Sequence, residues 1–267
     1  MRWSFHVGAV ISLFIAFALT GIAAAAEVTK PAKVTLSCGY NYITGKYGRA
    51  TATTVSYAPV TLKVKEEHWV VKVTVPYISV SGPGVGGSDG GDLGGVTSTG
   101  TEKGLGDLQI GYSYLYTWGS PDLTGDMTVK FKLPTADAHR NLGTGKMDYT
   151  VQAGLNRNFG DFYVSGSAGR KMNGSSDRFR LRDVWRYSVG GGMNVNPYLM
   201  VGASYDFREA SSATGHSVSQ VTGFMNYNLT DTWSVQVYAG TGFTVSSPDF
   251  STGVQLNYKF NMPDLDR

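Results

Sequence analysis

The sequence predicts an all-β protein, a single transmembrane outer-membrane β-barrel with about 12 antiparallel strands, short periplasmic turns and longer external loops. Three observations predict this fold. Apolar and polar residues alternate in segment after segment from Lys33 onward, the connections between these segments are alternately short and long, and aromatic residues gather at the segment ends. The composition agrees, because the 267 residues include 35 Gly and 16 Tyr while only 16% are charged.

The first 26 residues have the pattern of a secretory signal peptide. Arg2 precedes an apolar run from Val7 to about Ala26, and small residues close the run with an Ala24-x-Ala26 cleavage motif. An N-terminal membrane anchor is the alternative, because about twenty apolar residues could cross a bilayer. We favour the signal peptide, since glycine and polar residues interrupt the run. The mature chain is then exported and begins near Glu27.

The twelve expected strands follow from a period of two, which gives each strand one apolar and one polar face. In the first, Val34, Leu36 and Cys38 alternate with polar or small residues. The expected strands are 33–43, 58–65, 69–77, 107–118, 127–133, 148–159, 162–169, 186–195, 199–207, 220–229, 233–243 and 250–260. This divides the mature chain into a periplasmic segment at 27–33, a barrel at 34–260 and a C-terminal tail at 261–267. Residues 27–33 could plug the barrel or fray from its end.

Connection lengths and aromatic residues place this barrel in a membrane. Tight turns follow the even-numbered strands and longer polar loops follow the odd-numbered ones, as in outer-membrane barrels. Two belts of Tyr, Trp and Phe fall at the opposite strand ends, where the membrane interfaces would lie. A soluble β-sandwich also alternates, but it buries its apolar face and seldom carries so many aromatic residues at strand ends.

A glycine-rich stretch from Ser81 to Val96 contains G-x-G-x-x-G, and Asp107 follows at the distance expected of a ribose-binding acid. A phosphate site requires a helix directly after the glycines, whereas a strand is expected here. A calcium-binding β-roll requires repetition of the Gly/Asp pattern, and the pattern occurs once. We therefore interpret 81–96 as a flexible external connection.

The polar faces of the strands would line the lumen of the barrel. Basic residues outnumber acidic ones on these faces, so the pore is expected to attract anions modestly. Near the external rim, opposite charges on neighbouring strands could instead pair with each other and brace the wall. The expected pore-lining charges are Lys63, Lys72, Asp107, Lys130, Lys132, Asp148, Arg186, Asp206, Arg208 and Lys259.

Four short motifs, in this order, resemble a family of outer-membrane transporters named after the meta-pathway of phenol degradation. The motifs are GLGD at 104–107, KLPT at 132–135, GTGKMDY at 143–149 and SYDFREAS at 204–211. The resemblance implies one outer-membrane barrel and passage of small, often aromatic or apolar, molecules. Residues 253–260 also resemble the terminal signal that the outer-membrane assembly machinery recognises, although NMPDLDR follows the final aromatic residue.

The expected function is passive passage of small solutes through a mildly basic lumen, in contact with outer-membrane lipid. A structural or adhesive barrel without transport is the alternative. We expect no enzyme, because His139, His216 and Ser219 lack a nucleophile motif around them. We also expect no metal or cofactor, since ligand spacing is missing. No nucleic-acid partner is expected, because the formal charge of +3 is small and scattered.

Overall fold

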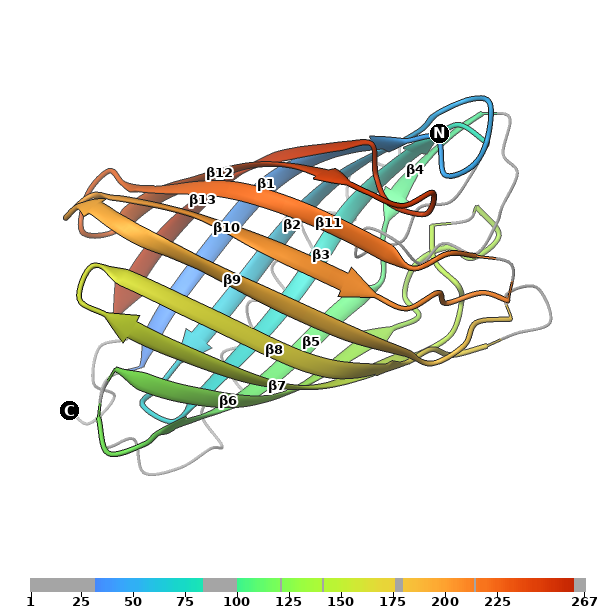
Figure 1. Cartoon of the computed structure of the whole chain (residues 1–267). Coiled ribbons are helices and arrows are strands. Elements are labelled where there is room, and N and C mark those ends of the chain that lie inside the picture. The colour runs from blue at the N-terminus through green and yellow to red at the C-terminus, as the bar shows by residue number, and fades with distance from the viewer. Residues whose placement is uncertain are drawn as a thin grey trace, which may run out of the picture.

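In the computed structural model the chain forms a closed antiparallel β-barrel (Figure 1). The structure describes residues 32–83, 100–120, 122–140, 142–175, 180–213 and 215–261. The expected signal peptide, nearly all of the segment at 27–33, most of the glycine-rich stretch at 81–96 and the tail after residue 261 lie outside these residues. In the part of the chain that the structure describes, no helix is long and apolar enough to cross a membrane.

The strands follow one another around the ring in chain order. They are β1 (Lys33–Gly45), β2 (Thr53–Lys65), β3 (Trp69–Ser81), β4 (Thr101–Leu105), β5 (Leu108–Thr117), β6 (Leu123–Leu133), β7 (Asp148–Phe159), β8 (Phe162–Met172), β9 (Val184–Asn196), β10 (Leu199–Arg208), β11 (Val218–Asn228), β12 (Trp233–Gly242) and β13 (Phe250–Asn261). β1 pairs with both β2 and β13, which closes the sheet. Closure satisfies the backbone groups of every strand, as a lipid environment requires, and excludes the two-sheet sandwich.

The barrel has the twelve strands that the alternation predicted, one of which is interrupted. β4 and β5 pair with successive parts of β3, so they are two pieces of the fourth strand. The break falls at Gly106 and Asp107, where we expected that strand to begin. The connection between the third and fourth strands is also shorter than expected, because β3 continues to Ser81 and β4 begins at Thr101.

The two ends of the barrel differ in the length of their connections. One end, here called the turn end, carries the short turns at 66–68, 118–122, 160–161, 197–198 and 229–232. The other, here called the loop end, carries the longer connections at 46–52, 82–100, 134–147, 173–183, 209–217 and 243–249. The turns lie to the left in Figure 1 and the loops to the right.

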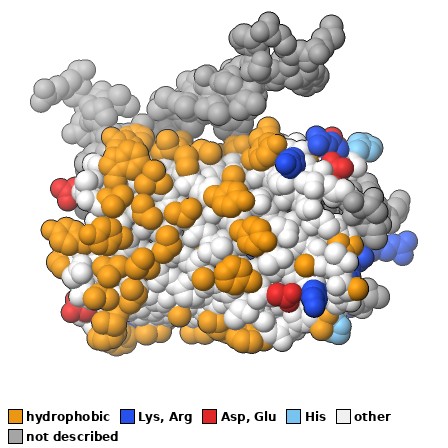
Figure 2. Space-filling view, turned by 90° about the horizontal axis from the view of Figure 1, so that it is seen from above, with side chains coloured by type: hydrophobic (Ala, Val, Ile, Leu, Met, Phe, Trp, Pro, Cys, Tyr) orange, Lys and Arg blue, Asp and Glu red, His pale blue; other side chains and the backbone are white. Residues whose placement is uncertain are grey.

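The outer wall is apolar and its aromatic side chains form contacts at both ends. Hydrophobic side chains cover much of the visible wall, and charged ones lie toward its two ends (Figure 2). At the turn end, the rings of Trp233 and Tyr258 are 4.7 Å apart. At the loop end, Trp185 stacks on Tyr187 at 6.3 Å. These contacts occur where the sequence predicted two aromatic belts.

Candidate pore lining

Four of the predicted pore-lining lysines lie in one row of cross-strand neighbours on the inner face of the barrel. Lys63 on β2 is opposite Lys72 on β3, and Gly111 on β5 joins Lys72 to Lys130 on β6. The complete row, here called the lysine row, is Lys259, Thr35, Lys63, Lys72, Gly111, Lys130, Thr150 and Lys171. Because barrel strands tilt, a row perpendicular to them rises along the barrel axis. It therefore runs from the turn end of β13 to the loop end of β8.

Positive charge is densest where this row begins, at the turn end of the lumen. The ammonium group of Lys63 is close enough to those of Lys65, Lys72 and Lys259 to interact with them electrostatically. Lys33, on β1, pairs with Lys65 in the adjacent row of the same face. The sheet thus places five lysines on four neighbouring strands, because adjacent strands are only about 4.8 Å apart.

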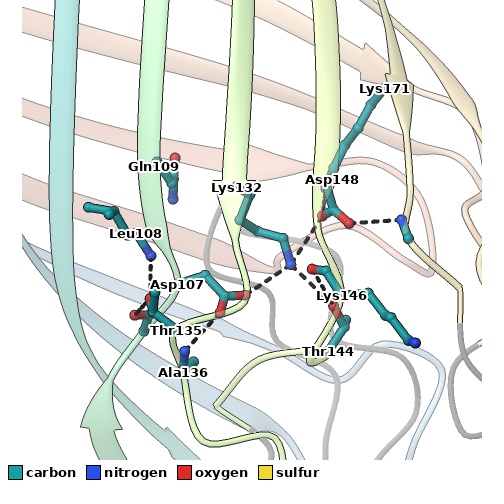
Figure 3. Close-up of polar contacts among 12 residues, drawn as sticks. Asp107, Leu108, Gln109, Lys132, Thr135, Ala136, Thr144, Lys146, Asp148 and Lys171 are labelled. Carbon is teal, nitrogen blue, oxygen red and sulfur yellow. Dashed lines mark hydrogen bonds and ion pairs between the residues drawn. The ribbon is translucent and has the colours of Figure 1, made fainter.

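At the loop end, charged residues pair with each other in a group here called the rim cluster: Asp107, Lys132, Asp148 and Lys171 (Figure 3). Lys132 Nζ is 2.9 Å from Asp107 Oδ2 and 3.1 Å from Asp148 Oδ2. Lys171 Nζ is 3.4 Å from Asp148 Oδ2. The Asp107 side chain is 1% exposed and that of Asp148 is 3% exposed. Two carboxylates and two ammonium groups balance, so this cluster adds no net charge to the lumen.

The rim cluster also holds the connection between β6 and β7 against the inside of the barrel. The backbone amide of Ala136 donates a hydrogen bond to Asp107 Oδ1, with a length of 3.0 Å. Leu142, which is 1% exposed, packs on Gly104, since a Cβ built on that glycine would be 2.5 Å from Leu142 Cδ1. Residues 134–147 therefore narrow the lumen at the loop end.

The predicted residues Arg186, Asp206 and Arg208 lie on the inner face of β9 and β10, beside the rim cluster. Arg186 is directly opposite Arg208, and Asp206 is opposite Ser188. Asp206 Oδ2 accepts a hydrogen bond of 3.0 Å from the Ser204 hydroxyl. The register therefore brings the two arginines together across the strand pair.

Two of the inner-face charges that the sequence analysis did not include lie beyond strand ends that it placed too early or too late. Lys171 lies two residues beyond the predicted end of its strand, and Asp126 lies one residue before the predicted start of its strand. Asp126 Oδ2 accepts a hydrogen bond of 2.9 Å from Thr128. The same alternation, extended to the polar residues at each strand end, would have found both.

Ser219, which the sequence analysis considered and rejected as a nucleophile, forms hydrogen bonds with its neighbours. Ser219 Oγ lies 2.9 Å from the hydroxyl of Tyr205, and the Ser219 amide donates to Ser247 Oγ at 2.9 Å. Among the described residues, no group of three His, Cys, Asp or Glu side chains could hold a metal ion.

A closed barrel with an apolar wall is the fold that the resemblance to the transporter family implied. The family model described as "Putative MetA-pathway of phenol degradation" matches residues 36–260. The chain belongs to this family. The match begins in β1 and ends in β13, so it includes every strand of the barrel. No curated protein is similar enough in sequence to count as a relative.

Solved structures with the same fold are outer-membrane barrels. The COG4313 outer membrane channel from Pseudomonas putida F1 superposes with a TM-score of 0.68 at 16% identity, covering 88% of this chain and 97% of that one. The KdgM porin superposes with a TM-score of 0.55 at 10% identity, covering 84% and 99%. The translocator domain of the autotransporter NalP from Neisseria meningitidis has a TM-score of 0.50 at 11% identity, covering 95% and 96%. At these identities the likeness shows a shared fold.

Proposed function

We propose that this family member is a passive outer-membrane channel for small solutes, including aromatic and apolar compounds, with a lumen that favours anions. The observation that carries the proposal is the lysine row inside a closed, apolar-walled barrel. In the outer membrane, the turn end of this channel would face the periplasm and the loop end would face outward. A signal peptide at 1–26 would export the chain, and the terminal strand would present it to the assembly machinery.

The charge balance inside the barrel supports an anion preference. The rim cluster is neutral as a group, whereas Lys63, Lys65, Lys72 and Lys259 form no salt bridge with another residue that the structure describes. A concentration of one sign of charge in a low-dielectric passage raises the local concentration of counter-ions. Chloride and small organic anions should therefore enter more readily than potassium.

The test is single-channel recording of the folded protein in a planar bilayer with a KCl gradient across it. We expect discrete current steps and a reversal potential of the sign that chloride preference produces. The double variant Lys63→Gln and Lys72→Gln should move the reversal potential toward zero. Lys46→Gln, in the 46–52 connection outside the barrel wall, is the matched control and should leave it in place. Cation preference in the wild-type protein would rule out the basic lumen as a filter.

One observation favours the alternative of a structural or adhesive barrel. The 134–147 connection lies inside the loop end and narrows it, so the lumen could be closed to solutes. The same recordings decide between the two functions, because a folded barrel that carries no current at any voltage would support the alternative. Uptake of labelled small aromatics into vesicles containing the protein would then show whether any route exists.

A further inference from the structure

A second row of the inner face is aromatic, and the sequence analysis did not find it. Tyr163 on β8, Phe224 on β11 and Tyr238 on β12 fall on one line of cross-strand neighbours. This aromatic row is Tyr163, Gly192, Gly202, Phe224, Tyr238, Gly253, Asn41, Tyr57, Ile78 and Gly104. It rises from the turn end of β8 to the loop end of the barrel at β3 and β4. The four rings are half-buried.

Three of these rings lie flat against the wall because a glycine is their cross-strand neighbour. A Cβ built on Gly192 would lie 2.8 Å from Tyr163 Cε1. A Cβ on Gly202 would lie 2.5 Å from Phe224 Cζ, and one on Gly253 would lie 2.5 Å from Tyr238 Cε1. Any larger residue at these glycines would push the ring into the lumen. The rings therefore cover the glycines and turn one face toward the passage.

Hydrogen bonds fix the central part of the row. The Tyr238 hydroxyl donates to Asn41 Oδ1 at 2.8 Å, and Asn41 Nδ2 donates to the backbone carbonyl of Tyr57 at 3.0 Å. With its hydroxyl engaged, Tyr238 presents ring carbons to the lumen. Phe224 and Tyr238 thus form a continuous aromatic surface on β11 and β12, and the Tyr238 ring extends it over Gly253 of β13.

The two rows share β13, β1, β2, β3 and β8, but the rings on β11 and β12 lie across the barrel from lysines of the other row. Phe224 on β11 is five strands from Lys72 on β3, and Tyr238 on β12 is six strands from Lys130 on β6, in a ring of twelve. A barrel of twelve strands lies between those that side chains fill and those with wide aqueous channels, so groups from opposite walls approach each other. A solute in this lumen meets aromatic faces on one side and ammonium groups on the other.

We propose that the two rows together bind small aromatic anions, of which aromatic carboxylates are the simplest class. The solute's ring stacks on the aromatic row, and its carboxylate points away from the electron-rich ring faces toward the lysine row. Each such ring contact changes the affinity only about two- to tenfold, which is weak enough for the solute to pass from one ring to the next. This inference deepens the proposed channel function and rests on it.

The experiment is a titration of the full-length folded barrel with benzoate, followed by saturation-transfer NMR, alongside the bilayer recordings. We expect saturable benzoate binding, weaker binding of benzyl alcohol, which lacks the charge, and weaker binding of acetate, which lacks the ring. Phe224→Leu should weaken benzoate binding about two- to tenfold, the effect of one ring contact. Lys63→Gln with Lys72→Gln should weaken benzoate binding while leaving benzyl alcohol binding in place.

The matched control is Phe207→Leu, the same substitution on the lipid face of β10. It should leave benzoate binding at the wild-type level, and the folded state of each variant is checked by its mobility on a gel without heating. Equal benzoate binding by wild type and by Phe224→Leu would overturn the inference. So would a wild-type barrel that conducts chloride but binds no benzoate, and the channel function would then stand alone. Benzoate binding that Phe224→Leu weakens in a non-conducting barrel would support the site and count against the channel.

Discussion

At the scale of single residues, the role of Asp107 in the structure differs from the role that its spacing in the sequence suggested. By spacing from the glycine-rich stretch it resembled a ribose-binding acid, yet its two oxygens are taken by Lys132 and by the amide of Ala136. Gly143 is pressed against it, because a Cβ there would lie 2.8 Å from Asp107 Oδ2. Asp107 therefore joins the interrupted fourth strand to the inward-folded 134–147 connection.

Asp107→Asn should destabilise the barrel, because the Lys132 ammonium, whose side chain is only 12% exposed, loses one of its two carboxylate partners. The expected loss is about 1 to 3 kcal/mol in the free energy of unfolding. Reversible urea unfolding in lipid vesicles measures it. The control is Glu102→Gln, which breaks the exposed pair between Glu102 and Arg140 and should cost less than about 1 kcal/mol. Equal losses in the two variants would show that the rim cluster does not brace the wall.

Tyr47, in the 46–52 connection, should remain protonated well into the alkaline range. Burial and, second, the negative charge of Asp249 raise the pKa of its hydroxyl from 10.0 to about 12. A raised pKa in the folded state means a stabilising contribution that is complete below pH 10 and is lost as the pH rises from 10 to about 12. NMR titration of tyrosine-labelled protein, assigned with Tyr47→Phe, measures this pKa. In Asp249→Asn it should fall without reaching 10.0, because burial remains.

At the scale of strands, the alternation was sufficient to predict the strands of the barrel wall. It was not sufficient to predict which connections fold into the lumen. Each strand needs one lipid-facing side, and this constraint leaves a period-two pattern that a single sequence reveals. The break at Gly106 and the inward path of 134–147 carry no such pattern, because they depend on contacts between segments far apart in the chain. The pairing of Lys132 with Asp107 and Asp148 was anticipated as one of two alternatives, since all three lie on neighbouring strands.

The lysine row and the aromatic row could not be predicted in full from the sequence for a similar reason. Knowing the phase of each strand identifies which residues face inward, but the rows depend on the register between strands. Lys63 and Lys72 are close in sequence across a tight turn, so their pairing could be expected. Tyr163 and Tyr238 are connected only through the registers of four strand pairs, which the sequence does not specify.

The phase of β3 is tested by two adjacent substitutions. Val73 lies on the lipid face midway between the belt residues Trp69 and Tyr77, so Val73→Lys should cost about 2 to 4 kcal/mol and impair membrane insertion. Thr74→Lys places the same charge on the inner face and should be tolerated. The yield of heat-modifiable folded protein in the membrane fraction compares the two. If both variants inserted equally well, the assignment of the faces of β3 would be wrong.

At the scale of the whole molecule, the charges inside the barrel are distributed differently at its two ends. The rim cluster balances its charges at the loop end, while five lysines lie together near the turn end and form no salt bridge with another residue that the structure describes. In the proposed channel, an anion entering from the loop end would therefore meet a narrow, neutral constriction first and the attractive potential afterwards. Size would then be selected before charge along this path.

This arrangement predicts that anion preference depends on ionic strength. Mobile ions screen the lysines over about 10 Å at 0.1 M salt but over about 3 Å at 1 M. The chloride-to-potassium permeability ratio, obtained from reversal potentials under tenfold KCl gradients, should thus be larger when the gradient is centred near 0.1 M than near 1 M. In Lys63→Gln with Lys72→Gln, the two conditions should give more similar ratios. A preference that stayed constant with salt would instead assign selectivity to the uncharged constriction at 134–147, because steric exclusion does not respond to screening.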